Sequence, residues 1–184
     1  MRVLVIGGGG REHALVWKIA QSPLVKKIYC APGNAGTANL AENINISSDN
    51  IDALIQFATV TGIGLTVVGP EQPLVKGIVD RFEGSGLRIF GPSQRAAEIE
   101  GSKVFCKDLM KKYGIPTARY ETFDSPDKVK FFTKENEPVV VKVSGLTAGK
   151  GVILCSDGVE AWSAVQSIML KKSFGNAGDQ VVGE

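Results

Sequence analysis

Short apolar runs alternate with amphipathic stretches over about the first 90 residues, and each apolar run ends in a glycine or proline loop. We expect strands at residues 3–6, 27–30, 65–68 and 88–90, and helices at residues 12–21, 51–61 and 74–82. Strands that alternate with crossover helices form a mostly parallel sheet. The sequence therefore predicts an open, Rossmann-like α/β domain, which would bind ligands at the carboxyl ends of its strands.

The second part of the chain has a different pattern. A helical stretch at residues 94–113 ends before Gly114, a residue type that commonly terminates helices. Beyond it we expect strands at residues 120–123, 138–143, 151–155 and 180–182, and helices at residues 126–133 and 159–170. We therefore divide the chain into an α/β domain with a linker helix, residues 1–114, and a small α+β unit, residues 115–184.

Charge and cysteine content narrow the class of protein. The 21 basic and 19 acidic residues are interspersed and give a net charge of +2, which does not favour nucleic acid or a membrane surface as partner. The cysteines, Cys30, Cys106 and Cys155, form no CxxC pair, as is typical of buried thiols in a reducing compartment. No apolar run reaches the roughly 18 to 20 residues of a membrane span. We expect a cytoplasmic protein with small-molecule ligands, and its oligomeric state stays open.

Four consecutive glycines, at positions 7–10, follow the first strand and open the first helix. Backbone amides at such a helix start hold phosphate groups, so we expect phosphate binding here; the alternative is a turn that only connects strand to helix. The loop departs from the GxGxxG fingerprint. Counting from Gly7 or from Gly8 places Glu12 or His13 at the third glycine, which disfavours a nicotinamide or flavin site.

A second glycine loop carries Gly145, Gly149 and Gly151 between Lys142 and Lys150. It is not a Walker A box, because the first interval is one residue short and Gly151 stands where a Ser or Thr should reach magnesium. Since we expect strands on both sides, we interpret it as a strand-loop-strand lid whose amides fold over a triphosphate. The alternative, a hairpin turn, needs only about two residues.

Other polar residues have weaker signals. Lys103 and Lys107 share one helical face at i, i+4, which is usually solvated and matters only beside a phosphate site. His13 is the single histidine, and no nucleophile elbow accompanies it, so we expect neither Ser-His-Asp nor Cys-His catalysis. His and Cys residues lack metal-ligand spacing. We assign no catalytic residue and no metal ligand.

Five motifs, GGGGREH, APGNAGT, VGPEQPL, GSK and VKVSGLTAGKG, lie at residues 7–13, 31–37, 68–74, 101–103 and 141–151. In this order and spacing they resemble the phosphoribosylamine-glycine ligase family (glycinamide ribonucleotide synthetases), ATP-grasp enzymes of purine biosynthesis, over the whole chain. The resemblance implies a pre-ATP-grasp domain followed by an ATP-grasp lid subdomain. It implies that ATP phosphorylates glycine and that the amine of 5-phosphoribosylamine attacks the glycyl phosphate, giving glycinamide ribonucleotide, ADP and phosphate.

The resemblance also implies roles for individual residues. Those expected to bind phosphoribosylamine are Gly8, Gly9, Gly10, Arg11, Glu12, His13, Asn34, Gly36 and Glu71. Those expected to bind ATP are Lys103, Lys142, Ser144, Gly145, Leu146, Thr147, Ala148, Gly149, Lys150, Gly151 and, on the adenine side, Glu184. Mg²⁺ or Mn²⁺ is implied with ligands outside this chain. Such a reaction is accelerated by charge neutralisation and alignment, and needs no nucleophilic side chain.

The end of the sequence departs from the family pattern. Family members continue after Val181 and Val182 with paired glutamates, whereas Gly183 and Glu184 end this sequence. The glycine site and the metal-binding part of the ATP-grasp fold have no counterpart. We therefore expect this polypeptide alone to be inactive or severely impaired. The alternatives are a non-catalytic fragment that binds nucleotide or sugar phosphate, and a related purine-pathway ATP-grasp enzyme, which would share the lid lysines but not the loop at residues 33–36.

Overall fold

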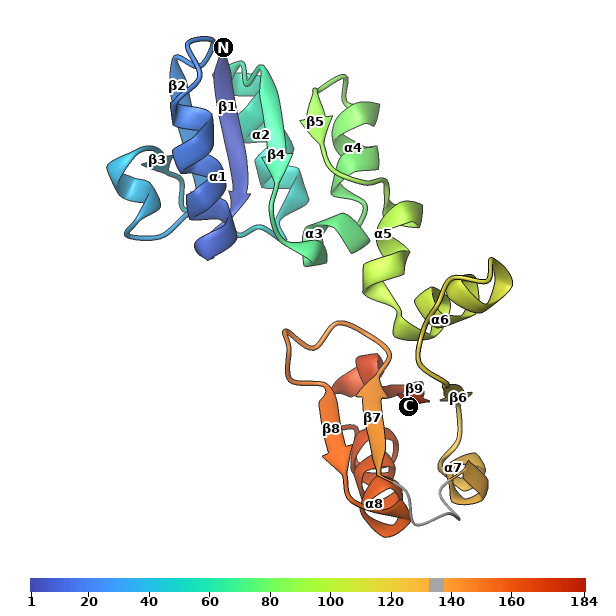
Figure 1. The fold of residues 1–184 in the computed structure, drawn as a ribbon. Helices are drawn as coiled ribbons and strands as arrows, with labels where there is room; N and C mark the ends of the chain where they lie inside the picture. Colours follow the sequence, from blue (N-terminus) through green and yellow to red (C-terminus); the bar gives the residue numbers. More distant parts are fainter. Residues whose placement is uncertain (133–137) are drawn as a thin grey trace. The chain divides into compact units, whose positions relative to one another are not determined.

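The computed structural model describes residues 1–132 and 138–184 (Figure 1). Its contacts divide the chain into two compact units, Met1–Ala97 and Glu98–Glu184. This division lies earlier than the boundary that we expected after residue 114. The helix at residues 103–112 packs with the second unit, where the N–H of Lys103 donates to the carbonyl oxygen of Ser144 at 2.9 Å.

Five strands of the first unit form one sheet in the order β3-β2-β1-β4-β5, with every adjacent pair parallel. They are β1 (Arg2–Gly7), β2 (Lys27–Pro32), β3 (Glu42–Asn43), β4 (Leu65–Val68) and β5 (Ile89–Phe90). The expected open parallel sheet is confirmed, and the short edge strand β3 was not expected. The chain runs outward from β1 to β2 and later crosses to β4. The strand order therefore reverses between β1 and β4, where sheets of this type bind ligands.

Helices cover both faces of this sheet, as the alternation of apolar residues along β1 requires. Val3 and Val5 pack under α1 (Gly10–Ala20) on one face, and Leu4 and Ile6 pack against α2 (Ile51–Thr61) and α4 (Ile78–Gly84) on the other. Figure 1 shows α1 in front of the sheet and α2 behind it. The helix α1 thus starts directly from the glycine loop that ends β1.

The prediction of a single helix at residues 74–82 is wrong. The structure has α3 (Glu71–Val75) and α4, separated by Gly77, which has a φ of +80° and cannot continue a helix. The side-chain amide of Gln94 donates to the carbonyl oxygen of Val75 at 3.1 Å. The glycine therefore breaks the helix, and a side chain from a distant part of the unit satisfies one of the carbonyl groups that the break releases.

The helical stretch expected at residues 94–113 is also divided, into α5 (Gln94–Gly101) and α6 (Lys103–Lys112). Ser102 lies between them in extended conformation, and its hydroxyl accepts the N–H of Phe105 at 3.2 Å. A serine in this position is a preferred N-cap. It starts a new helix instead of continuing the old one.

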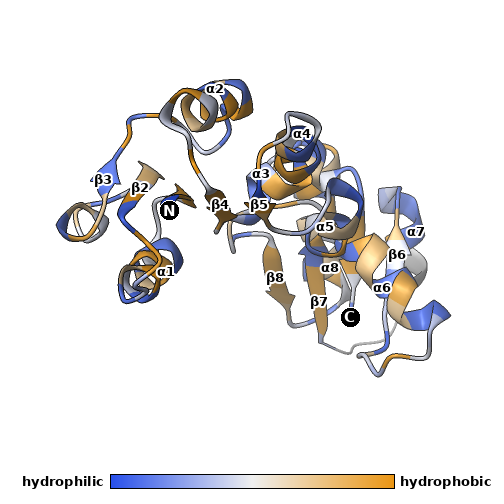
Figure 2. Ribbon diagram, turned by 90° about the horizontal axis from the view of Figure 1, so that it is seen from above, coloured by the Kyte–Doolittle hydropathy of each residue, from blue (hydrophilic) through white to orange (hydrophobic). Residues whose placement is uncertain are grey.

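Four antiparallel strands form the sheet of the second unit, in the order β6-β9-β7-β8. They are β6 (Glu121–Phe123), β7 (Val139–Val143), β8 (Val152–Cys155) and β9 (Val181–Gly183), and the helices are α7 (Pro126–Phe132) and α8 (Gly158–Met169). The last residue of the helix expected at 126–133 lies outside the described residues. Figure 2 shows that β7 and β8 are predominantly hydrophobic. One face of the sheet packs on α7 and α8, and the expected α+β unit is confirmed.

Candidate functional site

In the first unit, the loop after β1 lies directly against the loop after β2. Gly33 donates its N–H to the carbonyl oxygen of Gly7 at 3.0 Å, and a Cβ on Gly8 would lie 2.7 Å from the carbonyl oxygen of Gly33. Gly33 has a φ of +73°, and its own Cβ would lie 2.2 Å from Oδ1 of Asn43. The two loops are in backbone contact, which only glycine permits at these positions.

Asn34 holds the two loops together through its side-chain amide. Nδ2 donates to the carbonyl oxygens of Gly8 at 3.0 Å and Gly9 at 3.2 Å. Oδ1 accepts the N–H groups of Gly36 at 2.7 Å and Thr37 at 3.0 Å. Because both amide hydrogens and both oxygen lone pairs are used, the side chain orders the backbone of the two loops.

Two residues that we did not select complete this network. Thr37 is fully buried, and its hydroxyl accepts the N–H of Asn34 at 2.7 Å. Asn43, on β3, donates through its side-chain amide to the carbonyl oxygen of Asn34 at 2.8 Å. Thr37 lies inside the second motif and could have been included on that ground. Asn43 had no signal in the sequence, because its two-residue strand was not expected.

Glu12 and the ion pair of Arg11 with Glu71 differ in exposure. Glu12 is 4% exposed, and its Oε2 accepts the N–H of Gly9 at 2.6 Å. Arg11 is 72% exposed and lies 3.0 Å from the carboxylate of Glu71. The N–H of Glu71 itself, assisted by Arg11, holds the pKa of the Glu71 carboxyl below its usual range. The pair is therefore solvated, and it places two opposite charges at the carboxyl ends of the strands.

His13 lies against the second loop, since a Cβ on Gly36 would be 2.5 Å from its Cε1. Together with the contacts above, this brings the residues expected to bind phosphoribosylamine to the carboxyl ends of β1, β2 and β4. Their role in binding stays a prediction.

In the second unit, one glutamate lies between two lysines from different elements. Glu184, directly after β9, forms ion pairs with Lys142 on β7, at 2.5 Å, and with Lys107 on α6. The side chains of Glu184 and Lys107 are only 11% and 14% exposed. Burial alone would raise the pKa of Glu184, but hydrogen bonds from the two lysines outweigh it and hold the pKa below its usual range. The Glu184 carboxyl group therefore stays ionised between the two lysines.

Lys103 lies near this cluster, at the start of α6. Burial lowers the pKa of its ammonium group, Glu100 opposes this effect, and the charge of Lys142 adds to it. Its Nζ lies 3.5 Å from the carbonyl oxygen of Gly145. The hydroxyl of Ser144 accepts the N–H of Val104 at 3.3 Å. The first turn of α6 is thus attached to the end of β7, where the second glycine loop begins.

The loop between β7 and β8 is anchored at both ends and exposed at its tip. A Cβ on Gly145 would lie 2.8 Å from Cα of Ala177, and one on Gly151 would lie 2.4 Å from Oγ1 of Thr147. The tip consists of exposed residues, Ala148, Gly149 and Lys150, with φ of +50° at Ala148 and +81° at Gly149. The expected strand-loop-strand arrangement is confirmed, and Leu146 lies half-buried within it.

Lys107 is the charged residue that sequence reasoning missed. We interpreted its i, i+4 spacing from Lys103 as a solvated face, which is wrong for Lys107. Besides its ion pair with Glu184, its Nζ donates to the hydroxyl of Thr117 at 2.6 Å and lies 5.4 Å from the centre of the Tyr120 ring. The spacing of the lysines was visible, but the approach of Glu184, which follows β9 about 77 positions later in the chain, was not.

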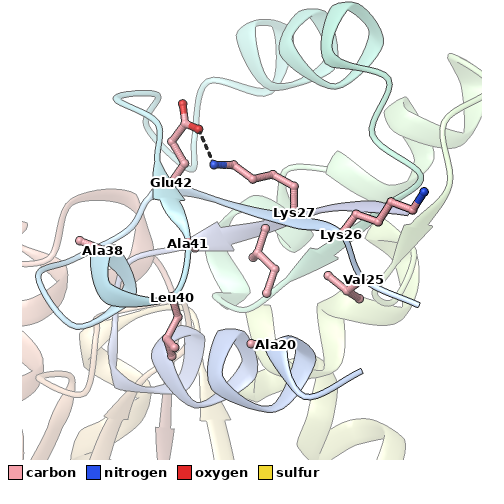
Figure 3. A pocket seen from close by; sticks show the side chains of 9 residues that line it. Ala20, Val25, Lys26, Lys27, Ala38, Leu40, Ala41 and Glu42 are labelled. Carbon is pink, nitrogen blue, oxygen red and sulfur yellow. Dashed lines mark ion pairs between the residues drawn. The ribbon is translucent and has the colours of Figure 1, made fainter. Parts of the chain in front are cut away.

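A separate hollow of about 350 Å³ in the first unit contains none of the expected site residues (Figure 3). It lies between the end of α1, β2 and the segment before β3, with Ala20 and Leu40 among its lining. Lys27 and Glu42 form an ion pair of 3.0 Å at its edge. The hollow is thus distinct from the glycine loops at the carboxyl ends of the strands.

Within residues 1–132 and 138–184, no group of three or more His, Cys, Asp or Glu side chains could hold a metal ion. In the same part of the chain, no helix is both long and apolar enough to cross a membrane.

Family models match both units. A model of the phosphoribosylglycinamide synthetase N domain matches residues 1–100, and a model of the ATP-grasp (A) domain of that synthetase matches residues 101–184. The phosphoribosylamine-glycine ligases of Caldanaerobacter subterraneus subsp. tengcongensis and Haemophilus influenzae are 55% and 52% identical to this chain over its entire length. The chain spans only 44% of each of these relatives.

Solved structures match both the family and the fold. The crystal structure of phosphoribosylamine-glycine ligase from Thermotoga maritima matches with a TM-score of 0.80 and 31% identity, over 100% of this chain and 43% of that one. The biotin carboxylase domain of 2-oxoglutarate carboxylase from Hydrogenobacter thermophilus matches with a TM-score of 0.75 at 22% identity, over 98% of this chain and 43% of that one, and so shares the fold. The chain belongs to the phosphoribosylglycinamide synthetase family.

Proposed function

We propose that this chain is the amino-terminal part of an ATP-dependent ligase of purine biosynthesis that joins glycine to 5-phosphoribosylamine through glycyl phosphate. The products are glycinamide ribonucleotide, ADP and phosphate. The observation that carries the proposal is the consecutive match of both units to the N and ATP-grasp domains of one synthetase. The chain spans less than half of its relatives, so turnover is proposed for the longer protein.

The first unit contributes the phosphoribosylamine side. The ordered loops after β1 and β2 present backbone groups at the strand ends, and Glu71 presents a carboxylate that its own N–H and Arg11 keep ionised. A fixed carboxylate and fixed backbone groups suit a polar sugar with an amine. These residues bind and orient the substrate, which raises the rate by alignment.

The second unit contributes the ATP side. ATP supplies the phosphoryl group when bound, and the residues present fit a polyphosphate. Lys103 and Lys142 carry positive charge beside a glycine loop with an exposed, backbone-rich tip. Glu184 and Lys107 hold the ammonium group of Lys142 in place. Fixed positive charges of this kind neutralise the negative charge that accumulates during phosphoryl transfer.

Magnesium or manganese also belongs to the proposal, but the described residues offer no cluster of ligands for it. We therefore assign none of them to a metal ion and derive no step from one. A cytoplasmic location is proposed because all three cysteines, Cys30, Cys106 and Cys155, are free thiols.

Calorimetric titration of this chain with ATP, and separately with ribose 5-phosphate, tests the assignment of ligands to the units. We expect Lys142→Met to weaken ATP binding at least tenfold and to leave ribose 5-phosphate binding unchanged. Lys128→Met removes an exposed lysine of the same unit and is the matched control. Equal ATP affinity of the Lys142→Met and Lys128→Met variants would contradict the proposal.

The second candidate function is binding without turnover, which the coverage of only 44% of the relatives favours for this chain alone. An assay of ADP release that depends on both glycine and phosphoribosylamine distinguishes the two. We expect no turnover above background from residues 1–184. A rate close to that of a full-length ligase would show that the chain is itself a competent enzyme.

A further inference from the structure

The carboxyl group of Glu12 fills the crevice at which the strand order of the first sheet reverses. Gly7 ends β1 and Gly69 follows β4, the two strands on either side of the reversal. A Cβ on Gly7 would lie 2.6 Å from Cδ of Glu12, and a Cβ on Gly69 would lie 2.1 Å from its Oε1. Glycine at both strand ends therefore leaves space that the carboxyl group occupies.

The same carboxyl group is tied to the start of α1. Its Oε2 accepts the N–H of Gly9, the residue that caps the helix. A carboxylate in the first turn satisfies a free N–H group and interacts favourably with the positive end of the helix. In phosphate-binding glycine loops, the phosphate of the ligand takes up these two interactions.

No cation offsets this charge. In the part of the chain that the structure describes, Glu12 forms no ion pair, and its buried Oε1 has no hydrogen-bond partner. Arg11, the next residue, directs its guanidinium to Glu71 instead. An anion that approached the amides of this loop would meet a negative charge at short range and in a poorly solvated place, where repulsion is strong.

We propose that Glu12 replaces the ligand phosphate in the loop after β1, so that this loop rejects phosphate and faces the ribosyl and amine part of the substrate. Glu12 is then a specificity-determining positioning residue. The inference deepens the proposed function and rests on it for the identity of the substrate. It also explains the departure from the GxGxxG fingerprint. Glu12 occupies the position of the third glycine, and its carboxyl group fills the space between the helix and the strand ends.

The test is a titration of the 184-residue chain with inorganic phosphate, followed through the amide NMR signals of Gly8, Gly9 and Gly10. We expect these signals to stay unshifted in the unsubstituted chain. In Glu12→Gln and Glu12→Ala these signals should shift with phosphate. The shift should appear at phosphate concentrations at least tenfold below the highest one that leaves the unsubstituted chain unshifted. Glu12→Gln keeps an acceptor for the Gly9 N–H, so it separates charge from shape. Glu83→Gln, an exposed carboxylate of the same unit, controls for net charge.

Each outcome decides the proposal. Phosphate-dependent shifts of the three glycine amide signals in the unsubstituted chain would overturn it. The absence of such shifts in a folded Glu12→Gln chain would also overturn it. If the substituted chains do not fold, the titration of the unsubstituted chain still decides whether the loop takes phosphate. Ribose 5-phosphate binding that is measured by calorimetry and shifts these amides, while inorganic phosphate leaves them unshifted in the unsubstituted chain, supports both proposals. Its complete absence refutes the proposed function without touching the phosphate titration.

Discussion

The two candidate sites are held together by different interactions. In the first unit, the loops are joined by backbone contacts and by the side-chain amide of Asn34, and a single carboxylate, Glu12, is enclosed among glycines. In the second unit, Lys107 and Lys142 surround Glu184, and the loop tip beside them is exposed. The stability of the first site therefore depends mainly on close packing, and that of the second on ion pairs. Substitutions that disturb packing should destabilise the first, and substitutions that remove a charge should destabilise the second.

The largest effect is expected from Gly33→Ala. The added Cβ would combine a left-handed backbone with an approach of 2.2 Å to Asn43, so we expect a loss of about 3 kcal/mol in the free energy of unfolding. Gly86→Ala is the matched control, because Gly86 has a φ of +72° and nothing within 4 Å of its Cβ; about 1 kcal/mol is expected there. Urea unfolding of both variants measures the difference. Equal losses would mean that contact between the loops does not stabilise the first site.

Asn34→Ala should have the next largest effect, a loss of about 2 kcal/mol, because it removes four hydrogen bonds, two from backbone N–H groups and two to backbone carbonyl groups. Urea unfolding measures this loss, and faster hydrogen exchange of the Gly36 and Thr37 amides should accompany it. If exchange at these two amides were unchanged, the network would not hold the loops as described.

Lys107→Met tests the second site. It leaves Glu184 largely buried with one lysine instead of two, so we expect a loss of about 1 to 2 kcal/mol in the free energy of unfolding. Lys128→Met breaks an ion pair in which both partners are more than half exposed, and should change stability by about 0.5 kcal/mol or less. Thermal unfolding of the two variants compares them directly. A similar shift for both would contradict the idea that ion pairs stabilise this site.

The smallest effect concerns pH. Because folding lowers the pKa of Glu184, its contribution to stability is complete above the unfolded value of about 4.3 and is lost as the pH falls through the lower folded value. The stability difference between the unsubstituted chain and Glu184→Gln should thus be constant from about pH 7 to 5 and shrink below about pH 4. Chemical unfolding at several pH values measures it. A stability difference that persisted at low pH would mean that Glu184 stabilises the fold through packing and not through its charge.

Local pattern was sufficient for most of the fold. The helix at residues 51–61 and the strand at residues 65–68 have the bounds that periodicity predicted. Asn50 and Gly62 cap the helix, and Gly64 and Gly69 border the strand. Prediction was wrong where one residue interrupts a continuous pattern. Gly77 and Ser102 each break a run that has helical composition on both sides, and the apolar period gives no sign of the break.

Neighbouring residues and motif spacing were enough to predict most strands and helices, the two glycine loops and the family resemblance. Which groups come into contact became visible only in the fold. It paired Lys107 and Lys142 with Glu184, joined the first two loops through Asn34 and Asn43, and enclosed Glu12 between Gly7 and Gly69. These contacts connect strand ends and helix faces that are far apart in the chain. Hydrophobic period and residue propensity describe only neighbouring residues, so they do not predict which distant residues come together in space.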